Sequence, residues 1–183
     1  MKRIPTKRLC LVPAGIELTE LMLAGRSKFA DNLEFIVPDN WPPDFLDENA
    51  LLHVLRGYEI NPENLKFPLY LIVIKEEKVV AGVAGYKSAP DETGEVEVGY
   101  SVLEQYRRNG IATEAVNALV DNAFSFRNIA SVTAETLPVL TASVGVLLKC
   151  GFVFEGEGSE PGAIKYRIQK EESSKEGSEG QSL

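Results

Sequence analysis

The alternation of apolar and polar residues predicts a chain that switches repeatedly between strands and helices. Residues 94–103 give the clearest strand, because every second residue from Val96 to Val102 is apolar and the residues between them are polar or glycine. Apolar residues then recur at helical spacing over 112–124, with no proline or glycine inside the segment. The change of period predicts a strand and a regular helix joined by the loop 104–109.

The rest of the chain gives further elements. Two β-rich runs, 67–75 and 79–87, are separated by three charged residues, a pattern typical of an antiparallel hairpin. The region 26–66 mixes helical spacing with four prolines and predicts one or two helices joined by irregular segments. The remaining expected elements are a strand at 6–12 before a turn at Pro13-Ala14-Gly15, a helix at 16–25, a strand at 129–136, a helix at 141–150, and strands at 152–154 and 163–169.

The order of these elements predicts the fold class. A hairpin that leads into strand-helix-strand crossovers indicates an α/β (α+β) protein with a mixed, mostly antiparallel central sheet. We expect helices on both faces of this sheet.

Length and composition indicate one folded domain. The chain has 183 residues, of which 44% are hydrophobic and 25% charged. We expect a single domain over residues 1–170, since no linker or repeat interrupts it. Residues 171–183 carry four glutamates against one lysine and no apolar residue before Leu183, so they predict a disordered acidic tail, with an interaction tail as the alternative.

Charge and rare residue types exclude several classes of function. The net charge of −8 argues against nucleic acid and against an anionic membrane surface as partners, because both need a clustered positive patch. The longest apolar run, 69–74, is too short to span a membrane, and the stretch 9–12 is too short for a signal peptide. Two cysteines and one histidine give no disulfide framework and no metal-ligand spacing. We therefore expect a cytoplasmic protein without a metal.

The segment from Gln105 to Ala112 is the candidate binding loop. It precedes the start of the regular helix, where free main-chain N–H groups and the helix dipole favour a phosphate. Gly110 permits a close approach of the main chain, and Arg107 and Arg108 add positive charge to an acidic chain. These residues alone leave two interpretations open, a pyrophosphate site and an ordinary loop with a solvated arginine pair.

Four segments, taken in order, resemble the GNAT superfamily of acetyl-coenzyme A-dependent N-acetyltransferases. The resemblance covers residues 6–169 and is closest to the subgroup that includes the ribosomal-protein N-terminal acetyltransferases. The segments are Gly94 to Val102, Arg107-x-x-Gly110-x-Ala112-Thr113-Glu114-Ala115, Thr136-Leu137-Pro138 with Thr141-Ala142-Ser143, and Leu148 to Phe152.

The resemblance implies a GNAT-like acyl-CoA N-acyltransferase fold with acetyl-coenzyme A as co-substrate. It assigns the acetyl carbonyl to main-chain N–H groups near Val102 and Leu103, which would polarise it as an oxyanion hole does. The pantetheine arm would lie in a splay between strands 94–103 and 129–136. The residues assigned to the pyrophosphate are Arg107, Arg108, Asn109, Gly110, Ile111 and Ala112, and Thr113 is a further candidate cofactor-binding residue.

Glu97 is the candidate general base. An attacking amine with an ordinary pKa of about 10 must lose a proton to solvent or to a positioned base. Glu97 lies five residues before Val102 on the polar face of its strand, where Glu95 would raise the pKa of Glu97 by like-charge repulsion. The alternative is that both carboxylates form a solvated face and that solvent is the base.

Two residues depart from the family pattern. Leu140 replaces an asparagine that many members carry, and this change removes a side-chain hydrogen bond to coenzyme A. The alternative is that Leu140 packs into the core and does not face the coenzyme. Leu147 aligns with the tyrosine that often protonates the departing thiolate. Ser143 is then the candidate proton donor, with capping of the helix start as its alternative role.

The sequence thus predicts an acyltransferase that moves an acetyl group directly from acetyl-coenzyme A to a primary amine. The acceptor is a peptide N-terminus or a small-molecule amine, and no residue pattern names it. The alternative is a catalytically inactive coenzyme A-binding module of the same fold, which the departures at Leu140 and Leu147 leave open. We expect a monomer or a homodimer.

Overall fold

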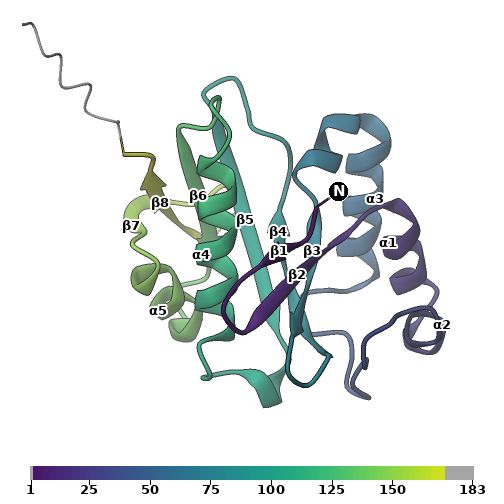
Figure 1. Ribbon diagram of the computed structural model, residues 1–183. Coiled ribbons are helices and arrows are strands. Elements are labelled where there is room, and N and C mark those ends of the chain that lie inside the picture. Colours follow the sequence, from purple (N-terminus) through teal and green to yellow (C-terminus); the bar gives the residue numbers. More distant parts are fainter. Residues whose placement is uncertain (1, 172–183) are drawn as a thin grey trace, which may run out of the picture.

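Eight strands form one continuous sheet in the computed structural model, which describes residues 2–171 (Figure 1). The strands lie in the order β1-β2-β3-β4-β5-β6-β8-β7, and each neighbouring pair is antiparallel except β5 and β6. The predicted mixed, mostly antiparallel sheet is therefore confirmed. The strands are β1 (Ile4–Pro5), β2 (Leu9–Ala14), β3 (Leu69–Ile74), β4 (Val79–Tyr86), β5 (Glu95–Val102), β6 (Ser131–Thr136), β7 (Val153–Glu157) and β8 (Ile164–Gln169). The predicted tail lies outside the described residues from residue 172 onward.

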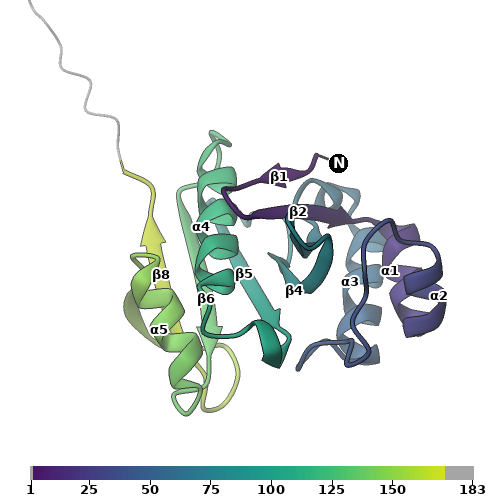
Figure 2. The ribbon, with the colours of Figure 1, turned by 60° about the horizontal axis from the view of Figure 1, so that its bottom comes forward.

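Helices cover both faces of the sheet, as predicted. The apolar side of α4 joins buried side chains from β2 to β6 in one core cluster. Side chains from α1, α2 and α3 form a second cluster with the opposite side of β2, β3 and β4, and Figure 2 shows these three helices grouped together. The helices are α1 (Ile16–Leu23), α2 (Arg26–Asp31), α3 (Glu48–Ile60), α4 (Ile111–Phe124) and α5 (Thr141–Lys149), with the short 3-10 helices η1 (Pro62–Lys66) and η2 (Glu104–Tyr106).

The first strand differs from the prediction at both ends. β2 continues through Pro13, and a short β1 that the pattern did not reveal pairs with Cys10 and Leu11. The β1 pairing ends at Leu11, so Pro13 has only β3 beside it. The N–H that proline lacks therefore removes no hydrogen bond of the sheet. Of the predicted turn Pro13-Ala14-Gly15, only Gly15 lies outside β2, directly before α1.

The parallel strands β5 and β6 separate along their length. They pair at three positions, the last of which joins Glu97 and Thr133. Beyond this point β5 pairs only with β4 up to Val102, whereas β6 pairs only with β8 up to Thr136. The predicted splay between these two strands is therefore present, and it begins after Glu97.

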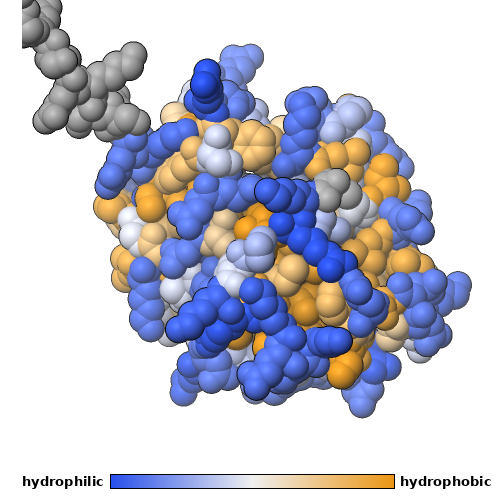
Figure 3. All heavy atoms as spheres, viewed as in Figure 1, coloured by the Kyte–Doolittle hydropathy of each residue, from blue (hydrophilic) through white to orange (hydrophobic). Residues whose placement is uncertain are grey.

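The surface mixes apolar and charged side chains. Hydrophilic residues interrupt the apolar ones across the face drawn in Figure 3. The exposed large apolar side chains include Ile36, Phe45, Ile60 and Val139. Within residues 2–171, no helix has both the length and the hydrophobicity that a membrane span requires.

Candidate functional site

A row of free main-chain N–H groups marks the candidate binding loop. Gly110 is the N-cap of α4, no side chain caps this helix, and the first helical hydrogen bond runs from Glu114 to the Gly110 carbonyl at 3.0 Å. Donors at a helix start, where the dipole is positive, favour an anion. Among the described residues, no acceptor is bonded to the N–H groups of Arg108, Asn109, Gly110, Ile111, Ala112 and Thr113.

The backbone of this loop alternates in handedness. Arg108 and Gly110 have positive φ angles of 61° and 74°, whereas φ of Arg107 is −66°. Such alternation turns successive N–H groups toward one side and forms a concave nest for an anion. A Cβ atom at position 110 would lie 3.3 Å from Nη2 of Arg8, so glycine keeps the backbone accessible. The loop therefore has the shape that the predicted pyrophosphate site needs.

The side chain of Arg107 holds the loop in place. Its Nε donates to the carbonyl of Val102 at 2.8 Å, and its Nη2 pairs with Asp44 at 2.5 Å. The segment before α3 is thereby tied to the end of β5. Arg108, by contrast, makes no ion pair with any described residue, so its charge remains available to a ligand.

Arg8, which the sequence analysis missed, balances the carboxylate nearest to the loop. It donates to Glu114 in the first turn of α4 at 2.6 Å and to the carbonyl of Asn109 at 2.8 Å. Burial opposes ionisation of Glu114, but hydrogen bonds from Thr6 and Arg8 outweigh it and hold the pKa of Glu114 below its usual range. The ion pair with Arg8 reduces the repulsion that this carboxylate would exert on a bound anion.

Of the two main-chain donors predicted at the end of β5, Val102 and Leu103, only that of Val102 faces the splay. Leu103 donates its N–H to the carbonyl of Ala81 at 2.9 Å. Opposing residues of an antiparallel pair alternate between bonded and non-bonded, so Val102, opposite Gly82, directs its N–H away from β4 and toward the splay. The prediction for Leu103 is therefore wrong, and that for Val102 stays a prediction.

Glu97 lies where the splay begins. It occupies the face of β5 opposite the one that packs on α4, and its side chain is 24% exposed. Its Oε1 is buried and forms an ion pair with Lys87, the partner that the described residues provide. The Glu97 side chain is therefore partly exposed on this face, and Lys87 balances the charge of its carboxylate.

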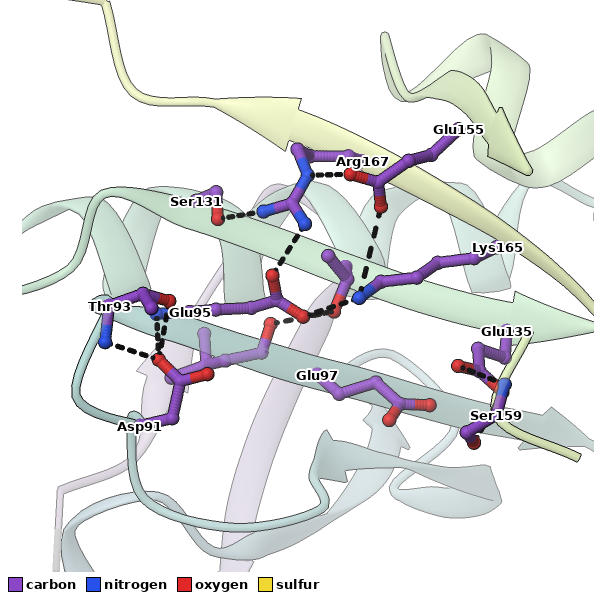
Figure 4. A network of polar contacts seen from close by, with 12 residues as sticks. Asp91, Thr93, Glu95, Glu97, Ser131, Glu135, Glu155, Ser159, Lys165 and Arg167 are labelled. Carbon is purple, nitrogen blue, oxygen red and sulfur yellow. Dashed lines mark hydrogen bonds and ion pairs between the residues drawn. The ribbon is translucent and has the colours of Figure 1, made fainter. Parts of the chain in front are cut away.

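Glu95 does not act on Glu97 as an unbalanced charge. Figure 4 shows the Glu95 carboxylate between Lys165 at 2.7 Å and Arg167 at 2.6 Å, both on β8, with Glu97 apart from this network. Burial opposes ionisation of Glu95, but hydrogen bonds from Lys165 and Arg167 outweigh it and lower the pKa of Glu95. The predicted like-charge repulsion is therefore wrong, because two cations already balance Glu95.

The network predicts a pH-dependent contribution to stability. We expect Glu95→Gln to lower the free energy of unfolding at pH 7 by about 1 to 3 kcal/mol, because charged hydrogen bonds to partly buried Lys165 and Arg167 are lost. The folded-state pKa of Glu95 lies below its ordinary value of 4.5, so this stabilisation is fully present above that pH and is lost as the pH falls through the folded-state pKa. In urea unfolding, the free energies of unfolding of the wild type and Glu95→Gln should differ at pH 7 and converge in acid. Equal free energies at pH 7 would contradict this expectation.

Ser143 lies on the other face of the splay and has an unexpected partner. Its Oγ is 3.0 Å from the hydroxyl of Tyr100, which also lies 3.1 Å from the Ser143 carbonyl. No side chain caps α5, so the capping alternative for Ser143 is wrong. Ser143 is instead linked to β5 from the first turn of α5.

Comparison with known proteins identifies the family of this chain. A family model described as "Acetyltransferase (GNAT) domain" matches residues 8–153. The chain belongs to the GNAT acetyltransferase family. The uncharacterized N-acetyltransferase YjdG of Bacillus subtilis (strain 168) is 26% identical over 161 residues, which cover 87% of this chain and 95% of that protein. The predicted resemblance and the predicted acetyltransferase class are confirmed.

Solved structures share the fold. The ribosomal-protein-S5-alanine acetyltransferase from Vibrio fischeri has a TM-score of 0.63 at 20% identity, covering 92% of this chain and 97% of that chain. The microcin C7 self-immunity acetyltransferase MccE, in complex with acetyl-CoA and AMP, has a TM-score of 0.63 at 17% identity, covering 90% of this chain and 94% of that chain. At these identities the similarity establishes a GNAT fold and leaves the acceptor open.

The two departures from the GNAT pattern have different surroundings. Leu147 is fully buried in the cluster that contains α4 and offers no polar group to a thiolate. Leu140 is only half-buried, is the N-cap of α5, and belongs to neither core cluster. The core-packing alternative for Leu140 is therefore wrong, and its proximity to the coenzyme stays a prediction.

We expect Leu140→Asn to bind acetyl-coenzyme A two- to tenfold more tightly, because the amide can form one additional hydrogen bond of about 0.5 to 1.5 kcal/mol. The melting temperature of the free protein should not fall, since asparagine is a favourable N-cap residue. Calorimetric titration and thermal unfolding measure both effects. The matched control is Leu148→Asn on the exposed side of α5, which should leave affinity unchanged. Unchanged affinity in Leu140→Asn would place the coenzyme away from this residue.

Two residues of the site escaped the sequence analysis. Arg8 lies 101 positions before the carbonyl that it contacts, and no local pattern indicates that contact. Tyr100 fitted the apolar face of a strand, and only its hydroxyl group hinted at a further role.

Proposed function

We propose that this GNAT protein transfers an acetyl group directly from acetyl-coenzyme A to a primary amine. The observation that carries the proposal is the run of unbonded N–H groups from Arg108 to Thr113, which lies next to the splay between β5 and β6. A concave row of donors beside a free arginine suits a pyrophosphate, and a gap between strands suits the extended pantetheine arm. These residues therefore fit the coenzyme that the family uses.

Different steps of the reaction are assigned to the two faces of the splay. Acetyl-coenzyme A supplies the activated acetyl group as a thioester. Glu97 faces one side of the sheet and accepts a proton from the amine, whereas Ser143 faces the other side and donates to the sulfur. The N–H of Val102 lies between them and polarises the acetyl carbonyl. Such an arrangement favours direct transfer without a covalent enzyme intermediate.

The acceptor is proposed as a peptide N-terminus or a small-molecule amine. The names of two structural neighbours support different acceptor classes. One name refers to a ribosomal-protein alanine, and the other refers to microcin C7. Among residues 2–171, no group of three or more His, Cys, Asp or Glu residues could hold a metal ion. The cytoplasmic location and the monomeric or homodimeric state stay predictions.

Calorimetric binding of acetyl-coenzyme A, followed by thiol release with a panel of acceptors, tests the proposal. The panel contains peptides that begin with serine or alanine, polyamines and an aminoglycoside. Binding with amine-dependent thiol release supports the enzyme, and binding without release on any acceptor favours the inactive module. Absence of binding and of a thermal shift at millimolar acetyl-coenzyme A would overturn the proposal.

A further inference from the structure

Tyr100 and Ser143 connect the two sides of the splay. Tyr100 lies on β5 after the last β5–β6 pair, and its side chain packs with the cluster on the α4 side of the sheet. Ser143 lies in the first turn of α5, the helix that follows β6. The hydroxyl of Tyr100 reaches both the Oγ and the carbonyl of Ser143, at 3.0 and 3.1 Å. The contact therefore bridges the strands where they no longer pair with each other.

The number of protons in this contact decides how it works. A phenol carries one proton, a serine hydroxyl carries one, and a carbonyl carries none. When Tyr100 donates to the carbonyl, the Ser143 proton points at the phenol oxygen. When Tyr100 donates to Oγ, the Ser143 proton is free to point at a third group. The pair can thus offer one O–H donor to the splay without leaving Ser143 Oγ unsatisfied.

Both titratable groups in this neighbourhood are protonated near neutral pH. Burial raises the pKa of Tyr100 to about 12, although the hydrogen bond with Ser143 acts in the opposite direction and Cys150 adds to the increase. Burial likewise raises the pKa of the Cys150 thiol to about 11. Tyr100 therefore stays a hydrogen-bond donor and does not become a phenolate.

We propose that Tyr100 is a positioning residue that orients the Ser143 hydroxyl as a hydrogen-bond donor to the sulfur of coenzyme A. The inference rests on the proposed function, because it needs the coenzyme in the splay. It explains how a GNAT protein with a buried leucine at position 147 still presents a hydroxyl on this face. When the carbon–sulfur bond breaks, its electron pair stays on sulfur, and the Ser143 O–H stabilises the thiolate until solvent protonates it.

The test is the pKa of the thiol of coenzyme A bound to the protein, followed by ultraviolet absorbance of the thiolate. Protein saturated with acetyl-coenzyme A is the blank, since the thioester has no thiol and the protein cysteines contribute equally. In the wild type we expect the bound thiol to titrate about one pH unit below its ordinary value of about 8.5. Tyr100→Phe should reverse at least half of that decrease, and Ser143→Ala should reverse all of it.

Two controls keep the outcome interpretable. The double variant Tyr100→Phe/Ser143→Ala should have the same bound-thiol pKa as Ser143→Ala alone, because Tyr100 acts through Ser143. Tyr86→Phe removes another buried phenol, whose hydrogen-bond partners are the Leu119 carbonyl and Asn122 and not Ser143, and it should leave the thiol pKa at the wild-type value. Thermal unfolding checks that each variant is folded, and Phe preserves the packing of the ring in the core.

The inference and the proposed function fail differently. If coenzyme A does not bind the wild type, the proposed function is wrong and the inference falls with it. If coenzyme A binds but the thiol pKa is unchanged from that in solution, or is equal in the wild type and Tyr100→Phe, the inference alone is overturned.

Discussion

We expect Gly110→Asp to bind acetyl-coenzyme A about 100-fold more weakly than the wild type. The new carboxylate would lie within the row of N–H donors, next to a ligand that carries several negative charges, at a cost of about 3 kcal/mol. The loop residue has φ of 74°, which aspartate and asparagine tolerate better than most residues, so the fold should survive. Calorimetric titration with acetyl-coenzyme A measures the loss.

The matched control for this variant is Gly110→Asn. Asparagine imposes the same bulk near Arg8 and nearly the same backbone cost, but it carries no charge. It should weaken binding by no more than about tenfold, since it mainly narrows the approach to the backbone. The additional deficit of the aspartate variant should shrink as salt is raised, because screening weakens charge repulsion. Equal affinities of the two variants would place the phosphates elsewhere.

We expect Glu97→Gln to lower kcat by about 100-fold near neutral pH, with little change in the affinity for acetyl-coenzyme A. Glutamine keeps the size of the side chain but cannot accept the amine proton. As the pH approaches the pKa of the amine, a larger fraction of acceptor is already deprotonated and the difference should decrease. Thiol release with the acceptor found in the panel, followed from pH 7 to pH 10, measures this change.

Glu92→Gln is the charge-matched control for this second variant. Glu92 is exposed in the loop before β5, so Glu92→Gln should have the turnover rate of the wild type. Glu97→Gln also removes the ion pair with Lys87, so the melting temperature should be recorded with the rates. Wild-type turnover of Glu97→Gln at every pH would assign proton removal to solvent.

Much of the fold was predictable because its periodicities are local. The alternation over 94–103 and the helical spacing after it identified β5 and α4, and the charged turn after residue 75 identified the hairpin of β3 and β4. The pattern failed at Pro13, where the tolerance of a strand for proline depends on whether another strand lies beside it. That information lies in a neighbouring strand and not in the residues around the proline.

The candidate site divides in the same way. The loop from Arg107 to Thr113 was predictable from the sequence as a candidate phosphate site, since glycine and the start of a regular helix favour an anion through the backbone itself. The state of individual groups was not visible, because it depends on partners distant in sequence. Lys165 lies 70 residues after Glu95 and balances the charge of the Glu95 carboxylate. The Ala81 carbonyl accepts the hydrogen bond from the N–H of Leu103.

The sequence by itself thus determined most of the order of elements through local spacing and the family through the resemblance of four segments, and it predicted the candidate binding loop. The tertiary structure decided which donors are free, which charges are balanced and which hydroxyl faces Ser143. A hydrogen bond or an ion pair depends on separations of about 3 Å. The contact between Tyr100 and Ser143 spans 43 residues, so only the packing of α5 beside α4 and β6 could bring the two hydroxyls together.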